Sequence, residues 1–163
     1  MIGLESTGLH TNGYSLARKI IFEKLGLSIN SYVPELSTTV AEALLTIHKS
    51  YYPELRKYAQ PELIHGMAHI TGGGLVGNLK RIIPNHLTAQ IDCQTWECPP
   101  LFQWLVKEGE VPLEDAYAAF NMGIGLVIIV SADHAQEIFT ATRGKIIGKI
   151  KKRVNTDSVI LNF

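Results

Sequence analysis

The sequence has few cysteines and no excess of charge of either sign. Cys93 and Cys98 are its only cysteines, too few for a disulfide framework and without a second pair to complete a zinc site. We expect both thiols to be reduced, as in a cytosolic protein. Lys plus Arg and Asp plus Glu each total 15, so no broad basic field exists to attract nucleic acid or an acidic membrane surface.

Long apolar runs are also lacking. The run from Ile124 to Val130 is far shorter than a membrane-spanning helix, and no signal peptide opens the sequence. We therefore expect a soluble, cytoplasmic protein without nucleic-acid or membrane partners. The 163 residues are 46% hydrophobic, which is enough apolar material for one core and predicts a single domain over 1–163.

One dense positive run is present, from Lys145 to Arg153. Its lysines alternate with Ile146, Ile147 and Ile150, a pattern that suits a strand with one solvated face. We interpret the run as a solvated surface rather than a binding patch.

Hydrophobic periodicity and turn residues predict an α+β fold with a mixed sheet covered by helices in layers. The expected helices span about 14–25, 39–48, 53–58, 75–83, 101–107, 113–120 and 132–142. Ser37 or Thr38 is the expected cap of the second helix. The expected strands span 1–4, 63–70, 88–92, 124–130, 145–150 and 154–161, and the last two are candidates for an adjacent antiparallel pair.

A polar loop with two glycines precedes the first expected helix. It runs from Ser6 to Tyr14 and contains a histidine, two threonines and an asparagine. Two interpretations are open. The backbone amides and the positive end of the helix dipole could bind phosphate, or Thr11 or Asn12 could simply cap the helix while Gly13 eases a turn.

A second glycine loop follows the expected strand 63–70. Gly72, Gly73 and Gly74 are consecutive, which costs conformational entropy and favours a ligand loop over plain packing. The loop lacks the Gly-Lys-Ser or Gly-Lys-Thr sequence that ends a P-loop, and it lacks the alternating glycines of a dinucleotide-binding motif. Asn78 lies about one helical turn after the glycines, so its amide could point back to the loop.

Two of the six histidines stand beside these loops, His10 and His69. His65 lies four residues before His69, which would make a metal pair on a helix, but this stretch is predicted to be a strand. We therefore predict no metal site. We expect ordinary surface positions for the other three, His48, His86 and His134.

At these loops the sequence is very similar to the aminoimidazole ribonucleotide synthetase family, an ATP-dependent cyclo-ligase family. Residues 6–16 resemble one family signature, and 65–75 with Asn78 resemble a second. Residues 102–105 and 120–125 resemble further regions in the right order. The resemblance covers nearly the whole chain and implies the C-terminal, substrate-side domain of such an enzyme.

The resemblance implies the ATP-dependent ring closure of formylglycinamidine ribonucleotide, in which the protein mainly orients the reactants and stabilises charge. No catalytic acid or base is assigned. The residues expected to border the substrate are His10, Thr11, Asn12, Gly13, His69, Thr71, Gly72, Gly73, Gly74 and Asn78.

The family also has an N-terminal domain that binds ATP and forms the main dimer interface, and nothing in the 163 residues resembles it. We expect ATP and Mg²⁺ as cofactors of the full-length, homodimeric enzyme, no cofactor on this domain alone, and no turnover by this domain alone. Two alternatives stay open: another ATP-dependent enzyme of the same superfamily, or a free-standing, non-enzymatic paralogue that binds a phosphorylated ligand or a partner.

Overall fold

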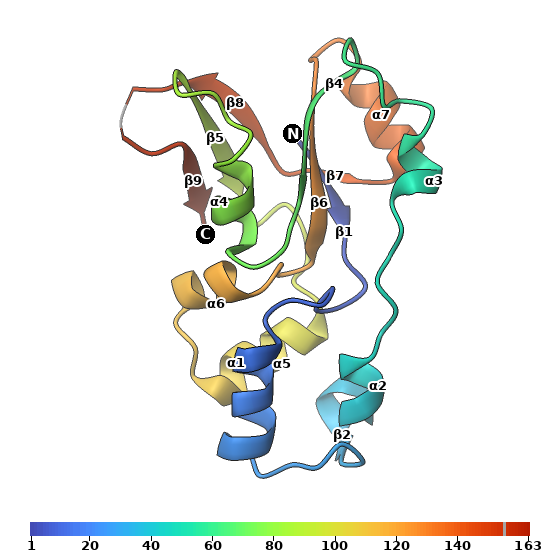
Figure 1. Ribbon diagram of the computed structural model, residues 1–163, viewed down its shortest axis with the longest axis vertical. Helices are drawn as coiled ribbons and strands as arrows, with labels where there is room; N and C mark the ends of the chain where they lie inside the picture. Colours follow the sequence, from blue (N-terminus) through green and yellow to red (C-terminus); the bar gives the residue numbers. More distant parts are fainter. Residues whose placement is uncertain (155) are drawn as a thin grey trace.

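A four-stranded antiparallel sheet forms the centre of the upper half of the molecule (Figure 1). The computed structural model describes residues 1–154 and 156–163. The strand order is β4 (Ile64–His69), β6 (Ile124–Val130), β1 (Ile2–Glu5) and β7 (Lys145–Ile146). The apolar run predicted as a buried strand is β6, which pairs with β4 on one side and β1 on the other.

A second, three-stranded sheet lies beside the first. Its order is β8 (Gly148–Lys152), β5 (Leu87–Asp92) and β9 (Val159–Asn162). β5 pairs with β8 antiparallel and with β9 parallel, so this sheet is mixed. The predicted pairing of the last two strands with each other is therefore wrong, because β5 lies between them. Asn155, within the predicted strand 154–161, lies outside the described residues.

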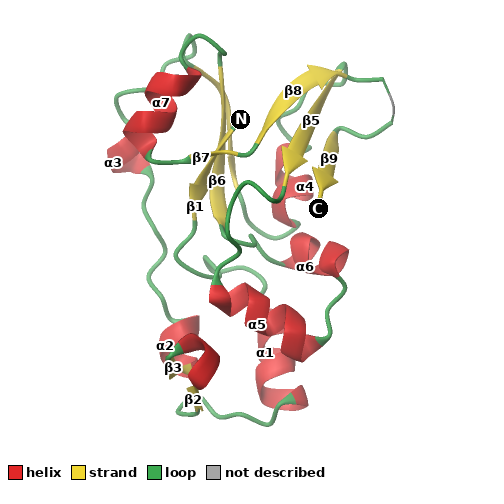
Figure 2. Ribbon diagram, turned by 180° about the vertical axis from the view of Figure 1, so that it is seen from behind, coloured by secondary structure: helices red, strands yellow, loops and turns green. Residues whose placement is uncertain are grey.

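Short helices and a small hairpin complete the fold (Figure 2). α3 (Tyr52–Leu55) and α7 (Ala135–Thr142) lie together on one side of the large sheet. α4 (Gly74–Leu79) and α6 (Leu113–Ala119) pack against each other on the side of the small sheet. Below both sheets lie α1 (Tyr14–Arg18), the π-helix η1 (Lys19–Lys24), the strands β2 (Tyr32–Val33) and β3 (Thr38–Thr39), the 3₁₀ helix η2 (Pro34–Leu36), α2 (Val40–Leu44) and α5 (Pro100–Gly109).

The large sheet has apolar side chains on both faces. Leu126 and Ile128 of β6 pack in one cluster with Leu55 of α3 and Ile138 of α7. Val127 points to the opposite face, as strand alternation requires, and joins the main core. This double burial explains why β6 is apolar throughout rather than alternating.

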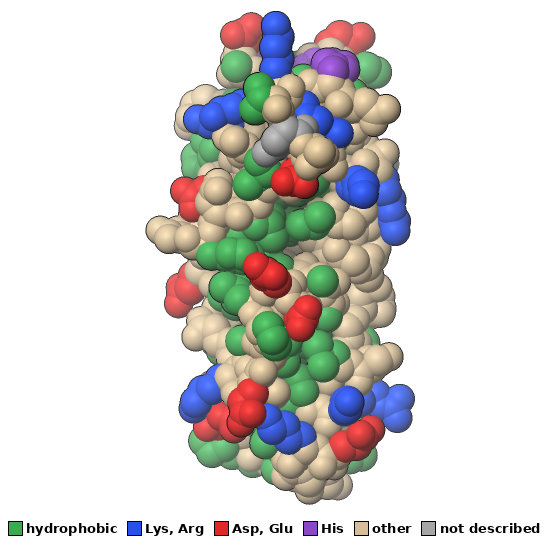
Figure 3. All heavy atoms as spheres, turned by 90° about the vertical axis from the view of Figure 1, so that its left-hand side faces the viewer, with side chains coloured by type: hydrophobic (Ala, Val, Ile, Leu, Met, Phe, Trp, Pro, Cys, Tyr) green, Lys and Arg blue, Asp and Glu red, His purple; other side chains and the backbone are tan. Residues whose placement is uncertain are grey.

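Apolar side chains also gather on the outer face near β9 and α6, as seen across the middle of Figure 3. A hollow of about 340 Å³ lies there, lined by Val76, Glu114, Tyr117, Ala118, Leu161 and Phe163. The Phe163 ring packs edge-on against Tyr117, with 5.0 Å between ring centroids. None of the helices described here combines the length and apolar composition that a membrane crossing requires.

The second predicted helix is shorter than expected and has a different cap. α2 begins at Val40, and its N-cap is Thr39 rather than Ser37 or Thr38. The Thr39 hydroxyl accepts a hydrogen bond from the Glu42 N–H (3.3 Å), and the Glu42 carboxylate accepts one from the Thr39 N–H (3.0 Å). After α2, residues 46–50 have no regular structure, and they lead into the site described below.

Candidate functional site

The first polar loop is held in an uncommon backbone conformation. His10 and Thr11 have φ angles of 52° and 65°, and Gly13 has 77°, a region that costs non-glycine residues free energy. The Asn12 amide donates a hydrogen bond to the His10 carbonyl (2.9 Å). Thr7 donates one to the Ile47 carbonyl (2.7 Å), which ties the loop to the segment after α2.

The loop does not cap the helix that follows it. Gly13 is the N-cap of α1, and no side chain makes a cap hydrogen bond. The interpretation of Thr11 or Asn12 as a helix cap is therefore wrong, because the Thr11 hydroxyl and the Asn12 amide both donate to the His10 carbonyl instead. Gly13 is required by packing as well as by φ, since a Cβ there would lie 2.4 Å from the Phe120 ring.

The second glycine loop is organised by the buried side chain of Asn78. Its amide nitrogen donates to the carbonyls of Thr71 (3.1 Å) and Gly74 (2.8 Å), and the Thr71 hydroxyl donates to its oxygen (3.0 Å). The amide points back to the loop, as the spacing predicts. With its polar atoms used in this way, Asn78 sets the shape of the loop.

The three glycines of this loop have different roles. Gly73 is the N-cap of α4 at φ 94°. Gly74 has φ 59°, and a Cβ there would lie 1.7 Å from the Tyr117 carbonyl oxygen, so α4 can approach α6 only through glycine. Gly72 is exposed, and a Cβ there would meet only the Asn12 side chain, 3.7 Å away. Packing therefore accounts for Gly74, whereas Gly72 is exposed and packing does not require a glycine there.

One hydrogen bond joins the two loops. The backbone N–H of Gly72 donates to the side-chain oxygen of Asn12 over 3.0 Å. Segments that are 60 residues apart in the sequence thus form one continuous surface. On it, Thr11, Gly72 and Gly73 are exposed, and Asn12 is half-buried.

A cluster of three histidines borders this surface. The His10 ring stacks on the His48 ring, with centroids 4.0 Å apart and planes 17° from parallel. The Nε2 atoms of His48 and His69 are 3.2 Å apart. The expectation that His48 is an ordinary surface residue is therefore wrong, while His86 is exposed as predicted. His134 is half-buried, and its ring lies 2.9 Å from the Ser131 hydroxyl.

His10 is the buried member of the cluster. Its Nε2 accepts a hydrogen bond from the Thr7 N–H (2.9 Å), and its Nδ1 is buried without a hydrogen-bond partner. Burial, assisted by the nearby His48, His69 and Lys49, lowers the pKa of His10 to about 4, so the ring is neutral at pH 7. Burial, followed by the effect of His48, also lowers the pKa of His69.

Tyr51 was not singled out from the sequence, and Gly125 was noted only as the last residue of the motif 120–125. The Tyr51 hydroxyl donates to the Glu5 carbonyl (3.0 Å), and its ring lies edge-on to His10. Gly125 of β6 lies against both side chains, since a Cβ there would be 2.1 Å from the Tyr51 oxygen and 2.7 Å from His10 Nδ1. No sequence pattern marks these contacts, because each joins segments far apart in the chain.

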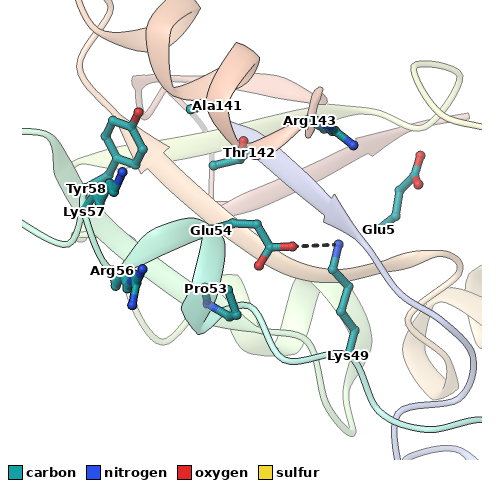
Figure 4. A pocket seen from close by; sticks show the side chains of 10 residues that line it. All are labelled: Glu5, Lys49, Pro53, Glu54, Arg56, Lys57, Tyr58, Ala141, Thr142 and Arg143. Carbon is teal, nitrogen blue, oxygen red and sulfur yellow. Dashed lines mark ion pairs between the residues drawn. The ribbon is translucent and has the colours of Figure 1, made fainter.

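A polar hollow of about 680 Å³ lies between α3, α7 and the end of β1 (Figure 4). Within it, the Lys49 amine pairs with the Glu54 carboxylate at 3.5 Å. Its lining is Glu5, Lys49, Pro53, Glu54, Arg56, Lys57, Tyr58, Ala141, Thr142 and Arg143. None of the predicted site residues lines this hollow, although Lys49 follows His48 directly.

Comparisons with known proteins identify the family of the chain. The family described as AIR synthase related protein, C-terminal domain, matches residues 1–160. A phosphoribosylformylglycinamidine cyclo-ligase of Syntrophotalea carbinolica is 45% identical over 157 residues, which are 93% of this chain and 45% of that protein. One from Trichlorobacter lovleyi is 40% identical over 168 residues, covering 99% and 48%. The chain thus spans less than half the length of these relatives.

Two solved structures share the fold at low sequence identity. A thiamine-monophosphate kinase from Stenotrophomonas maltophilia has a TM-score of 0.55 at 14% identity, covering 99% of this chain and 50% of its own. The hydrogenase maturation protein HypE from E. coli has a TM-score of 0.54 at 15% identity, covering 98% and 46%. The predicted α+β fold and the family resemblance are both confirmed. The chain belongs to the AIR synthase related protein family and matches its C-terminal domain.

Proposed function

We propose that this chain is the substrate-side part of an ATP-dependent cyclo-ligase that converts formylglycinamidine ribonucleotide to aminoimidazole ribonucleotide in purine biosynthesis. Relatives about 40% identical over most of the chain are named phosphoribosylformylglycinamidine cyclo-ligases, which supports a ligase of this pathway. The C-terminal domain match from 1 to 160 supports the assignment of this chain to the substrate side.

The hydrogen bond between Gly72 and Asn12 is the observation that carries the proposal. It brings together the two loops that the sequence marks for substrate binding. In this proposal the exposed backbone of Gly72 and Gly73 and the side chains of Thr11 and Asn12 contact the substrate. Gly13, Gly74 and Asn78 act indirectly, because the first two allow close packing and the third shapes the loop.

His10 and His69 are proposed to position the substrate rather than to transfer protons. His10 is neutral at pH 7, and its Nε2 already accepts the Thr7 N–H. Such a ring is poorly placed to give or take a proton during turnover. Thr71 contributes through its hydrogen bond to Asn78.

ATP and Mg²⁺ are proposed to bind elsewhere in the full-length, homodimeric enzyme, in the cytoplasm. The loops 6–14 and 69–78 contain no Asp or Glu, and Mg²⁺ is usually held by carboxylate oxygens and phosphates. The N-terminal domain of the full-length enzyme is the proposed source of these ligands. Alone, this chain is proposed to bind substrate without turning it over.

Amide NMR during titration with formylglycinamidine ribonucleotide tests the proposal. We expect the resonances of residues 11–14 and 72–75 to shift together, and Asn12→Ala to weaken binding. Asn85→Ala is a matched control, because Asn85 is exposed and lies outside both loops. Shifts confined to residues 145–153, with both loops unaffected, would show that the loops are packing elements and the substrate assignment is wrong.

A further inference from the structure

The histidine cluster brings together three imidazoles from separate parts of the chain. His10 comes from the loop before α1, His48 from the irregular segment after α2, and His69 from the end of β4. One ring nitrogen of each lies within 4.8 Å of those of the other two. The loop-forming hydrogen bonds described above do not require three histidines to meet, so the cluster calls for its own explanation.

The spacing of the two more accessible rings matches that of metal ligands. The Nε2 atoms of His48 and His69 are 3.2 Å apart. Two imidazole nitrogens bound to one tetrahedral Zn²⁺ at about 2.0–2.1 Å are separated by roughly 3.3 Å. The geometry points to a binding site for a divalent transition-metal ion such as Zn²⁺, formed by His48 and His69 with His10 as the third ligand.

The three ligands are not equivalent. His10 Nε2 accepts the Thr7 N–H, so a metal ion has to compete with that hydrogen bond for the same lone pair. The His10 ring stacks nearly parallel to the His48 ring, so His10 has to turn before it can face an ion held at the present spacing of His48 and His69. His48 and His69 are therefore the principal ligands.

The donor set also selects the class of metal. Neutral imidazole suits zinc, copper and nickel, whereas magnesium and calcium prefer carboxylate and carbonyl oxygens. Three protein ligands leave the fourth tetrahedral position for water or for an oxygen of a bound molecule. This site is thus different in chemistry from any Mg²⁺–ATP site, and the inference does not rest on the proposed cyclo-ligase function.

The test is Zn²⁺ binding by the full chain, measured by competition with a chromogenic chelator. We expect one Zn²⁺ per chain in the wild type and an affinity at least about tenfold lower in His48→Ala, since loss of a ligand costs no less than loss of a group that supports one. His65→Ala is the matched control, because His65 is exposed on the same strand as His69. The Zn²⁺ affinity of His65→Ala should equal that of the wild type.

Cobalt provides a second readout that does not depend on affinity alone. Co²⁺ bound by the wild type and by His65→Ala should give the intense visible absorption of a four-coordinate site, and His48→Ala should lose it. Circular dichroism of each variant verifies the fold. Equal Zn²⁺ affinity in wild type and His48→Ala, or an equal loss in His65→Ala, would overturn the proposal and leave the 3.2 Å contact as a hydrogen bond between two imidazoles.

Discussion

The side-chain oxygen of Asn12 accepts a hydrogen bond from the backbone N–H of Gly72, 60 residues further along the chain. The other end of the same amide donates to the His10 carbonyl. One side chain therefore holds its own loop in shape and joins it to the second loop. The proposed substrate surface therefore depends on this side chain as well as on the loop glycines.

Replacement of Asn12 by alanine should loosen both loops. Loss of the bonds to Gly72 and His10 should lower the free energy of unfolding by about 0.5–1.5 kcal/mol, because the site is only half-buried and water can replace part of the lost bonding. Urea denaturation measures this change. Asn30→Ala, at an exposed position, should stay within about 0.5 kcal/mol of the wild type. Equal stability of the two variants would contradict the role assigned to Asn12.

Asn78→Ala should be more damaging. This side chain is buried, and its removal takes one hydrogen bond from each of the Thr71 and Gly74 carbonyls and leaves the Thr71 hydroxyl without its acceptor. Each hydrogen bond contributes about 0.5–1.5 kcal/mol, so denaturation should show a total loss of about 1–3 kcal/mol. Amide NMR should also show the resonances of Gly72 and Gly73 displaced. A variant with wild-type stability and unshifted loop resonances would be inconsistent with this account.

Two glycines of α4 should respond to alanine in opposite directions. Gly74→Ala places a Cβ 1.7 Å from the Tyr117 carbonyl oxygen at a φ of 59°, so the free energy of unfolding should fall by at least about 2 kcal/mol. Gly77 lies in the same helix, and a Cβ there would meet nothing within 4 Å. Gly77→Ala should therefore stabilise the protein by about 0.5–1 kcal/mol. Thermal or urea denaturation of both variants distinguishes packing from intrinsic helix propensity.

The elements of the fold could be predicted from the sequence wherever they rest on local patterns. The apolar run of β6 and the glycine loop before α4 are examples, and the pattern also placed Asn78 correctly over its loop. The capping of α2 by Thr39 was missed because Ser37, Thr38 and Thr39 are all suitable cap residues. Only the path of the backbone through β3 decides between them.

The contacts of the site depend on tertiary structure and leave no local signal. His48 is 38 positions from His10 and 21 from His69, and only the route of residues 46–50 brings it between them. The pairing of β8 and β9 with β5 is equally non-local, since strand periodicity indicates which residues face inward but not which strand is the neighbour. From the sequence, Gly74 resembled a ligand-binding residue, because three consecutive glycines are typical of a loop whose backbone approaches a ligand. Only the structure shows that the Tyr117 carbonyl approaches Gly74 too closely for any side chain.

Acid should weaken the cap of α2. Hydrogen bonds from the Thr38 hydroxyl and from the backbone and hydroxyl of Thr39 lower the pKa of Glu42 to about 2. Because the folded state holds this pKa below its ordinary value of 4.5, the contribution of the cap to stability is fully present above pH 4.5 and is lost as the pH falls toward 2. NMR titration of the Glu42 carboxyl group should give a midpoint near 2, and Thr38→Val should raise it. A wild-type midpoint near 4.5 would contradict the capping geometry.

The 163-residue chain, given ATP, Mg²⁺ and formylglycinamidine ribonucleotide, should make no aminoimidazole ribonucleotide. The two loops that form the proposed substrate surface hold no Asp or Glu, so they lack the carboxylates on which a Mg²⁺–nucleotide complex usually depends. Their hydrogen bonds can orient the ribonucleotide. Without a phosphoryl group from ATP to activate it, however, the oriented substrate should not close to the imidazole ring. The measurement is a product assay at high protein concentration, accompanied by the NMR titration that verifies substrate binding. Sustained product formation that His10→Ala abolishes would show that the chain itself provides the nucleotide site, and the division of labour proposed here would be wrong.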